Sequence, residues 1–238
     1  MLRVQDLCFW YDTRDLPVLY NTTFALEEGQ IVSVVGSSGC GKSTLLQICS
    51  GLMHDHISRF PESGHFMTGS VLWKNLPLTG PIREFGYVPQ HYSGTLLRGK
   101  TALDNVLLAV KEDGISPEER ERAESLMTHS GIWEQKDSKI EHLSGGQQQR
   151  VAICRALITQ PGVVFMDEPF ANLDDSLKPG MSRLLRDFMT ELHLKLSVLL
   201  VTHDKRHAHE ISNEIVELTE RHGMPSSNVQ SMRGPRHD

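Results

Sequence analysis

Three short apolar runs stand out along this chain of 238 residues. Residues 31–35, 163–166 and 197–201 have the sequences IVSVV, VVFM and SVLLV, in which β-branched residues are frequent. Runs of this kind are typical of strands that are buried on both faces, as strands are in a parallel sheet. The pattern therefore predicts an α/β fold with a central parallel sheet.

Weaker patterns predict strands outside these runs. Residues 2–9 and 21–28 are expected to form antiparallel strands, ahead of a turn at Glu28-Gly29 that leads into the first apolar run. Residues 71–73 and 85–88 are predicted as two further strands, because each is a short run of apolar and aromatic residues.

Residues 52–68 contain glycine, proline and serine together with three histidines, His54, His56 and His65. Clustered histidines are frequent metal ligands. Their spacing here matches no helix face and no known ligand pattern, and no cysteine joins them. We therefore expect a surface loop rather than a metal site.

Residues 91–142 show the periodicity of helices. Thr101 and Asp104 have the spacing of a capping box, and an amphipathic pattern follows them, formed by Leu103, Val106, Leu107 and Val110. Ser116, Pro117 and an acid at the third helical position predict a second helix start. This stretch is expected to be a small helical insert in the α/β domain.

The remainder of the chain predicts a helix, a short strand and a tail. The helix carries one apolar stripe that is typical of core packing, formed by Met181, Leu184, Leu185, Phe188, Met189 and Leu192. Residues 211–218 predict a helix end followed by a short strand. The last residues are rich in Gly, Pro, Ser, Arg and His, which predicts a folded domain over 1–222 and a flexible tail over 223–238.

The first apolar strand leads into a glycine-rich loop and a helix. The loop fits the phosphate-binding pattern G-x-x-x-x-G-K-[ST], formed by Gly36, Ser37, Ser38, Gly39, Cys40, Gly41, Lys42, Ser43 and Thr44. Glycines let successive backbone N–H groups point at phosphate oxygens, and the helix N-terminus adds a favourable dipole. We expect Lys42 to contact the β- and γ-phosphates and the Ser43 hydroxyl to bind Mg²⁺.

The other two apolar strands end in ionisable residues. Asp167 and Glu168 follow one strand, and His203 follows the other. Open α/β sheets bind ligands at the carboxyl ends of their strands, where the phosphate loop is also expected. We expect Asp167 to hold Mg²⁺ through water, Glu168 to orient or deprotonate an attacking water, and His203 to have a catalytic role.

A glycine pair opens the helix that follows residue 144. Ser144 and Gln147 have the spacing of a capping box, which by itself predicts a helix start. A cap does not explain Gly145 and Gly146, because glycine lowers helix stability. Glycine here indicates that an anion such as a phosphate approaches the exposed N–H groups.

The composition and net charge limit the classes of partner that the sequence predicts. A net charge of −6 gives no global basic surface for nucleic acid. No apolar run approaches the length of a membrane span and the N-terminus does not resemble a signal peptide, so we expect a cytosolic protein that reaches membranes through partners.

The four scattered cysteines are expected to be reduced thiols. The charge of Lys42 and the nearby helix N-terminus favour a reactive thiolate at Cys40.

The order of these motifs resembles the ATP-binding cassette (ABC) ATPases over nearly the whole chain. The matches are Walker A at 36–44, the glutamine loop at Gln90, the signature LSGGQ at 143–147, Walker B at 163–167, the catalytic glutamate at Glu168, the D-loop at 171–174 and the switch histidine at His203. The D-loop departs from the more usual SALD by having the sequence ANLD.

The resemblance implies a fold and a set of roles. The fold is a P-loop NTPase core with a parallel sheet, an N-terminal antiparallel β subdomain and a helical subdomain at about 91–160. Tyr11 matches the aromatic that stacks on the base of ATP, whereas its local sequence favours a strand-end aromatic packed on the core. Gln90 is implied as a catalytic residue and as a Mg²⁺ ligand.

The resemblance also implies a head-to-tail dimer. In this family each nucleotide lies between the Walker motifs of one cassette and the signature of the other, which gives Ser144, Gly145, Gly146 and Gln147 a phosphate to bind. One chain carries one cassette, so a second copy or a related ABC subunit is the implied partner.

Two functional classes follow from the resemblance. The first is the ATP-hydrolysing subunit of a transporter, peripheral at the cytoplasmic side of the membrane. Its partners would be separately encoded integral membrane permease subunits, with a substrate-binding protein as a further candidate, and import is favoured over export. The second is a soluble ABC ATPase with a role such as iron–sulfur assembly, which single short cassettes also perform. The sequence does not identify the transported substrate.

Overall fold

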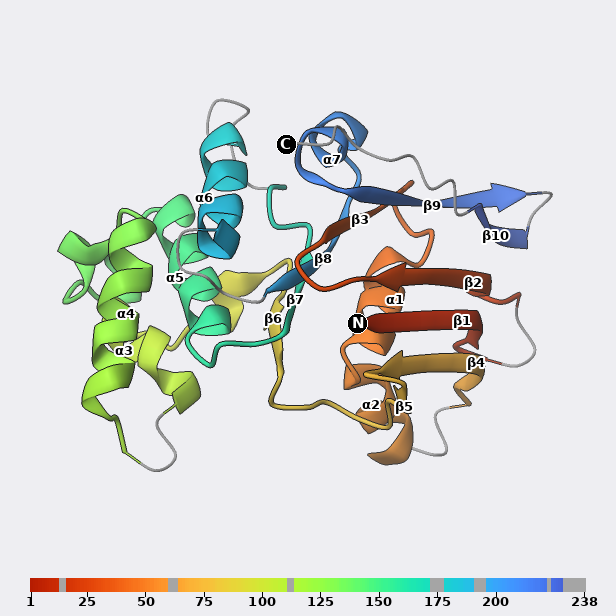
Figure 1. The fold of residues 1–238 in the computed structure, drawn as a ribbon, viewed down its shortest axis with the longest axis horizontal. Helices are drawn as coiled ribbons and strands as arrows, with labels where there is room; N and C mark the ends of the chain where they lie inside the picture. The colour runs from red at the N-terminus through yellow and green to blue at the C-terminus, as the bar shows by residue number, and fades with distance from the viewer. Residues whose placement is uncertain are drawn as a thin grey trace.

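Two β-sheets form the centre of the computed structural model, which describes residues 1–12, 16–59, 64–110, 114–171, 178–190, 196–221 and 224–228. The smaller sheet has the strand order β2-β1-β4-β5, and every pair in it is antiparallel (Figure 1). Its strands are β1 (Leu2–Trp10), β2 (Leu19–Leu26), β4 (Phe66–Trp73) and β5 (Leu76–Pro77). The predicted antiparallel β subdomain is confirmed.

The larger sheet has the order β10-β9-β3-β8-β7-β6. Its strands are β3 (Ile31–Gly36), β6 (Phe85–Val88), β7 (Val163–Asp167), β8 (Ser197–Thr202), β9 (Glu214–Arg221) and β10 (Met224–Asn228). All neighbours are parallel except β10, which pairs antiparallel with β9. The predicted central parallel sheet is confirmed.

Strand β10 differs from the expectation of a flexible tail from residue 223. Residues 224–228 pair with β9 in a regular antiparallel register, in which Ser226 lies opposite Thr219. The sequence MPSSN has a composition typical of loops, but β9 offers an unpaired edge whose backbone groups a following segment can satisfy. The expectation is wrong for these five residues, and residues 229–238 lie outside the described part of the chain.

The two faces of the larger sheet are buried in different cores. Along β7, Val163 and Phe165 point into one core while Val164 and Met166 point into the other, as the two-residue period of a strand requires. The first core also contains the smaller sheet and α1 (Lys42–Cys49). The second contains α3 (Ala102–Leu107), α4 (Pro117–His129), α5 (Gly145–Leu157) and α6 (Lys178–Thr190).

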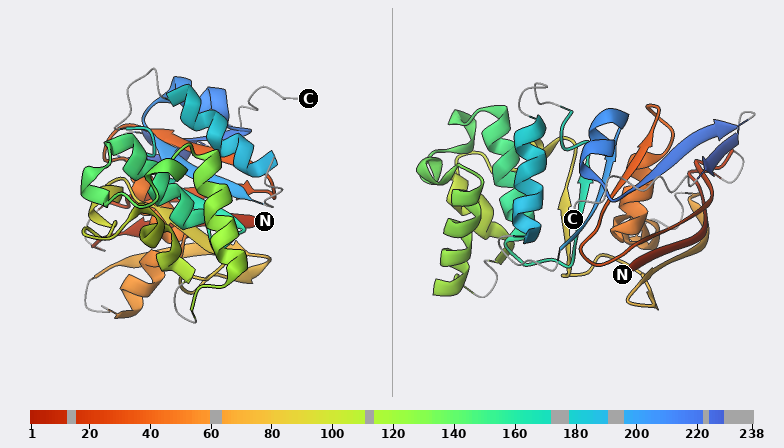
Figure 2. Two further views of the ribbon diagram at one scale, coloured as in Figure 1. Left: turned by 90° about the vertical axis from the view of Figure 1, so that its left-hand side faces the viewer. Right: turned by 45° about the horizontal axis from the view of Figure 1, so that its top comes forward.

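The helices α3, α4, α5 and α6 gather on one side of the larger sheet, away from α1 and the smaller sheet (Figures 1 and 2). Short 3₁₀ turns lie before α3, at Tyr92–Gly94, and between α3, α4 and α5, at Leu108–Val110, Trp133–Gln135 and Ile140–His142. The capping boxes predicted at Thr101 and Ser144 are formed, and the helix start predicted at Ser116 is also a capping box. Leu192, the last residue of the predicted apolar stripe, lies outside the described residues.

Residues 52–59 correct the prediction of a surface loop, because they form helix α2 (Leu52–Arg59). Gly51 has a φ of +84°, a conformation that favours glycine and lets the chain leave α1 and start a new helix. Met53 is 5% exposed, and it and Ile57 pack against the core that contains α1. The four-residue spacing of these two apolar side chains was a helical signal, which the flanking polar residues obscured.

Candidate functional site

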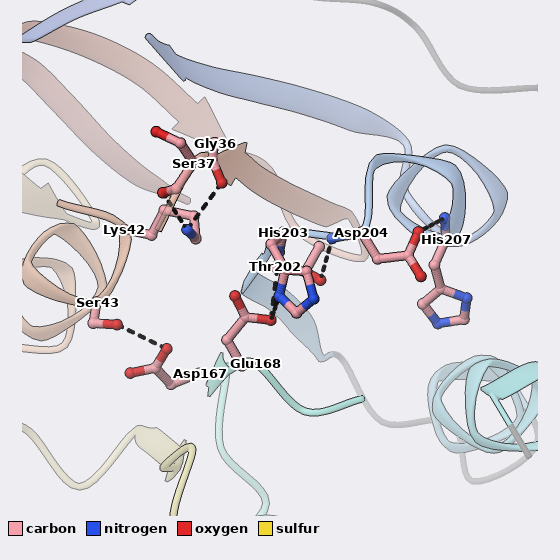
Figure 3. Close-up of polar contacts among 10 residues, drawn as sticks. All are labelled: Gly36, Ser37, Lys42, Ser43, Asp167, Glu168, Thr202, His203, Asp204 and His207. Carbon is pink, nitrogen blue, oxygen red and sulfur yellow. Dashed lines mark hydrogen bonds and ion pairs between the residues drawn. The ribbon is translucent and has the colours of Figure 1, made fainter. Parts of the chain in front are cut away.

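The carboxyl ends of three neighbouring strands meet at one edge of the larger sheet. In the register, Val35 of β3 lies beside Thr202 of β8, and Asp167 of β7 lies beside Val201. The residues that follow these positions are the phosphate loop, Glu168 and His203, so motifs far apart in sequence come together (Figure 3). The expected convergence of these three motifs is confirmed.

Two glycines show why the loop after β3 needs its sequence. A Cβ on Gly36 would lie 2.5 Å from Cys40 Sγ and 2.6 Å from the carbonyl oxygen of Leu218, so a side chain does not fit there. Gly41 has a φ of +97° and supplies the left-handed residue directly before α1. The loop can therefore curl tightly back onto the start of the helix.

The ammonium group of Lys42 lies inside this loop. Its Nζ donates hydrogen bonds to the carbonyl oxygens of Gly36 at 3.0 Å and Ser37 at 2.8 Å (Figure 3). Lys42 is only 7% exposed, so its charge lies against the loop rather than in bulk water. The arrangement concentrates positive charge where the backbone N–H groups of α1 begin.

Ser43 and Asp167 bring two oxygen ligands together. The Ser43 hydroxyl donates to Asp167 Oδ1 at 3.0 Å (Figure 3). Burial raises the pKa of the Asp167 carboxyl above its ordinary value and nearby Glu168 adds to this, whereas the Ser43 hydroxyl and the Lys42 and His91 charges act in the opposite direction. A hydroxyl and a carboxylate are hard oxygen donors of the kind that Mg²⁺ prefers.

Glu168 and His203 form a pair beside this oxygen cluster. His203 Nδ1 lies 3.0 Å from Glu168 Oε2, and the backbone N–H of His203 donates to the same oxygen at 3.4 Å (Figure 3). The Glu168 side chain is 9% exposed and that of His203 is 63% exposed. The carboxylate is thus sheltered beneath an imidazole that faces solvent.

The backbone of Glu168 is strained. Its φ is +47°, in the left-handed region that non-glycine residues adopt at a cost of about 1–2 kcal/mol. The Glu168 N–H donates to the carbonyl oxygen of Val201 at 3.0 Å, and its carbonyl oxygen accepts from Ala171 N–H at 3.1 Å. Strain of this size persists where the surroundings fix the conformation, which is frequent at functional sites.

Tyr11 contacts the first turn of α1. Its hydroxyl is 2.8 Å from Thr44 Oγ1, and its ring packs edge-on against Phe9 at 5.0 Å. The residue remains 42% exposed. The ring contact with Phe9 agrees with a strand-end aromatic packed on the core, and the exposed part of the ring leaves stacking on a base as a prediction.

Sequence reasoning missed two histidines at this site. His65 has its ring 5.2 Å from that of Tyr11, where the pairing of Trp10 with Phe66 in β1 and β4 places it. His91, next to Gln90, lowers the pKa of Asp167 through its charge. The strand register would have indicated His65, but no local pattern indicates His91.

The signature residues lie at the start of α5, on the other side of the larger sheet from α1 (Figure 1). Ser144 Oγ accepts from Gln147 N–H at 3.3 Å, and Gln147 Oε1 accepts from Ser144 N–H at 2.9 Å. The hydroxyl of Tyr92 donates to the carbonyl oxygen of Gly145 at 3.1 Å. Gly146 completes this first turn.

Gln90, Cys40 and the D-loop motif were also singled out in the sequence. Gln90 lies exposed in the turn after β6, at the predicted junction. Cys40 is 6% exposed, which argues against the accessible, reactive thiolate expected from its neighbours. Residues 172–174 of the D-loop motif lie outside the described residues.

Among the described residues, no group of three or more His, Cys, Asp or Glu side chains is arranged to hold a metal ion. In the same part of the chain, no helix is long and apolar enough to cross a membrane.

Comparison with known proteins identifies relatives of this arrangement. The Fe(3+) ions import ATP-binding protein FbpC of Brucella melitensis is 37% identical over 203 residues, which cover 85% of this chain but only 54% of that protein. The arginine/ornithine transport ATP-binding protein AotP of Pseudomonas aeruginosa is 34% identical over 98% of this chain and 95% of its own length. The chain thus spans about half the length of FbpC and nearly all of AotP.

A solved structure matches the fold. The dimeric bacterial ABC transporter cassette MJ0796 superposes with a TM-score of 0.75 and 28% identity, covering 98% of this chain and 100% of that one. The family model described as ABC transporter matches residues 19–171, which contain the phosphate loop, the signature and Glu168. With these matches and the convergence of motifs at one sheet edge, the chain belongs to the ABC transporter family.

Proposed function

We propose that this chain is an ATP-binding and ATP-hydrolysing subunit that powers transport through separate membrane subunits. The observation that carries the proposal is the pairing of Glu168 with His203 beside the Ser43–Asp167 contact. A base, a pair of oxygen ligands and a phosphate loop at one sheet edge are the components that phosphoryl transfer to water requires.

The triphosphate of ATP fits the loop of residues 36–44. The backbone N–H groups at the start of α1 hold the phosphate oxygens, and Lys42 moves from the loop carbonyls to the β- and γ-phosphates. Tyr11 stacks its exposed side on the adenine base. The burial of Lys42 and Thr44, both 7% exposed, supports this assignment because it keeps the lysine charge inside the loop and out of bulk water.

Mg²⁺ fits the oxygen cluster. Ser43 and Asp167 already converge at 3.0 Å, and the burial of the carboxyl favours a cation as the group that stabilises its charge. Ser43 would bind the ion directly, Asp167 would hold it through water, and Gln90 would complete the site. The ion supplies charge neutralisation on the phosphates.

Hydrolysis then depends on Glu168. Its carboxylate accepts a proton from water as the water oxygen bonds to the γ-phosphorus, and the bond to the ADP oxygen breaks. His203 holds this carboxylate through the 3.0 Å contact with Nδ1, so that the carboxylate does not turn away from the water. The sheltered position of Glu168 keeps bulk water from competing.

The active unit is a head-to-tail dimer. The first turn of α5 has capped but otherwise available N–H groups at Gly145 and Gly146, and it lies on the other side of the sheet from its own loop. A second copy, or a related ABC subunit, brings a phosphate to it. The dimeric state of the matched cassette MJ0796 supports this arrangement.

Membrane permease subunits are the proposed partners, with import as the direction. The relatives FbpC and AotP carry the words import and transport in their names. A cavity of about 300 Å³ lies between the edge strand β6 and the helices, where such a subunit would dock, and is lined by Phe85, Gly86, Tyr87, Leu108, Ala109, Arg155, Ala156 and Thr159. The chain would then lie at the cytoplasmic face of the membrane, with a substrate-binding protein as a further candidate partner.

Replacing Glu168 with Gln tests the ATPase assignment. The amide keeps the shape of the carboxylate but does not accept the proton, so hydrolysis should fall by about 10²–10⁴-fold while ATP binding persists. Phosphate release measures the first and a fluorescent ATP analogue the second. Because ATP is not consumed, gel filtration should show a stable ATP-bound dimer, and a variant that stays monomeric would contradict the dimer proposal.

Transport requires a separate test. Co-expression with the membrane protein genes that neighbour its own, followed by affinity purification in detergent, should recover a polytopic membrane protein with this chain. Arg155→Glu, which places a negative charge in the cavity beside β6, should reduce this recovery without changing ATP binding. Recovery of soluble partners alone would contradict the transport role and leave the ATPase assignment intact.

A further inference from the structure

A buried histidine links the two strand ends that carry Glu168 and His203. His207 lies on α7 (Lys205–Ile211) and is 4% exposed, one helical turn after His203 (Figure 3). A polar side chain this deeply buried is expected to be hydrogen-bonded, and the contacts that it makes indicate what it holds in place.

The ring of His207 has partners on two sides. It packs edge-on against Phe170, with ring centroids 4.3 Å apart and planes at 76°. On another side, Nε2 lies 3.0 Å from Ser182 Oγ on α6, and Nδ1 lies 3.7 Å from Glu210 Oε2. The hydrogen bond to Ser182 fixes the ring orientation, so the edge-on contact with Phe170 is maintained.

Phe170 is the anchor of the strained turn at Glu168. The turn is closed by Ala171 N–H donating to the Glu168 carbonyl oxygen at 3.1 Å, and Phe170 is its buried residue at 2% exposed. The φ of +47° at Glu168 persists only if neighbouring contacts prevent relaxation. The contact with His207 is one that can do this, because it holds the side chain two residues away.

His207 is equally tied to the segment that carries His203. Its N–H donates to Asp204 Oδ1 at 3.0 Å, which caps α7, and Asp204 N–H donates to Thr202 Oγ1 at 3.1 Å (Figure 3). His207 therefore connects the two supports in two ways: its ring packs against Phe170, and its backbone N–H is anchored on Asp204, the residue after His203.

We propose that His207 is a positioning residue that keeps the Glu168 turn and the His203 strand end in register for hydrolysis. Its role is to preserve the 3.0 Å contact between Glu168 and His203 and not to take part in the reaction itself. The proposal rests on the proposed ATPase function. It predicts a loss in kcat without a loss in ATP binding, since Lys42 and Tyr11 lie on other elements.

The first test compares His207→Ala with His209→Ala, which removes an exposed histidine from the same helix. The expected result is a kcat about tenfold lower for His207→Ala with KM for ATP within twofold of the wild type, and no change for His209→Ala. Equal kcat values in the two variants would overturn the proposal. Because His207→Ala leaves a buried gap, two milder variants accompany it.

His207→Gln keeps an amide near the position of Nε2, and Ser182→Ala removes only its partner. His207→Gln should recover at least half of the lost kcat, and Ser182→Ala should lower kcat about threefold. If Gln behaves as Ala does while melting temperatures are equal, the hydrogen bond is not what positions the turn, and the proposal fails.

A measurement without ATP separates this proposal from the proposed function. In protein with isotopically labelled histidines, the His203 ring resonances, identified by their loss in His203→Gln, should move in His207→Ala and stay unchanged in His209→Ala at the same pH. Unchanged His203 resonances in His207→Ala would overturn the positioning role even if the chain hydrolyses ATP. An inactive wild type with moved resonances would contradict the ATPase function alone.

Discussion

Among single residues, Lys42 has contacts that lead directly to a binding prediction. It ties the loop together through two carbonyl oxygens, and in the proposed function it provides the charge for the phosphates. Lys42→Ala should weaken ATP binding by about 10–100-fold, because a charge-assisted hydrogen bond contributes roughly 1.5–3 kcal/mol. A titration with a fluorescent ATP analogue measures this.

The matched control is Lys74→Ala. Lys74 is also ion-paired, to Glu84 at 2.6 Å, but lies on the turn after β4, away from the phosphate loop. It should leave the affinity for the ATP analogue unchanged. An unchanged affinity in the Lys42 variant as well would refute the role assigned to that ammonium group.

The cysteines provide a second prediction at this scale. Cys40, Cys49 and Cys154 are buried and Cys8 is partly exposed. Burial raises the pKa of Cys49 far above its ordinary value and that of Cys154 to about 12, so neither forms the reactive thiolate near neutral pH. Iodoacetamide should therefore modify Cys8 first, as peptide mass spectrometry would show.

This outcome differs from what the sequence alone predicts. The sequence places Cys40 beside Lys42 and a helix N-terminus, both of which favour a thiolate, but it does not show that the sulfur packs against Gly36. Faster modification of Cys40 than of Cys8 in the native protein would contradict the burial argument. Cys8→Ser protein, which should resist alkylation, is the control.

Other residues at the site also differ in how far the sequence predicts their structure. A local motif singles out Glu168, and the Ser43–Asp167 contact agrees with two motifs that are both proposed to bind Mg²⁺. The left-handed φ of Glu168 and the buried position of His207 were not foreseeable. Both depend on how β7, β8, α6 and α7 pack together, which no short pattern encodes.

At the scale of elements, helix starts were predicted well and one whole helix was missed. The boxes at Thr101, Ser116 and Ser144 form because each is a local exchange of hydrogen bonds that needs only correct spacing. Helix α2 was missed because only two apolar side chains on it pack against the core, Met53, which is buried, and Ile57, which is partly buried. Short helices depend on tertiary packing more than on propensity.

The cap of α4 gives a stability prediction. Ser116 Oγ accepts from Glu119 N–H at 3.2 Å, and Glu119 Oε2 accepts from Ser116 N–H at 2.8 Å. Ser116→Ala removes the first of these bonds and should lower the free energy of unfolding by about 1 kcal/mol. Thr128→Ala, at an exposed position near the end of the same helix, should change it far less.

Urea denaturation of the two variants measures this difference. Equal unfolding free energies would show that the cap does not limit the stability of the domain, for example because α4 unfolds separately from the larger sheet. ATP binding should be unaffected in both variants, since α4 lies away from α1 (Figure 1).

At the scale of the whole molecule, the class of fold was predictable but its strand order was not. The apolar runs identify β3, β7 and β8 as buried parallel strands. Only the structure shows β8 inserted between β3 and β7, which brings His203 between the phosphate loop and Glu168. Strand order is set by how helices cover the two faces of the sheet, and this information is distributed over the whole chain.

The orientation of the signature also belongs to the whole molecule. Ser144 and Gly146 open α5 on one side of the larger sheet, whereas Ser38 lies in the loop before α1 on the other (Figure 1). In a head-to-tail dimer, Gly146 of one copy faces Ser38 of the other across a nucleotide. Cysteines placed at these two positions, in protein that lacks the four native thiols, should then form a disulfide between subunits.

A disulfide requires Cα atoms within about 7 Å, so it reports direct apposition of the two motifs. With ATP and the additional Glu168→Gln change, which prevents hydrolysis, most of the protein should run as a covalent dimer on a non-reducing gel. Without nucleotide the dimer band should be weak. Ser38→Cys alone controls for symmetric contacts between two phosphate loops, and Gly146→Cys alone for contacts between two signatures. Bridging only within one chain would refute the shared site, because each signature would then reach its own phosphate loop.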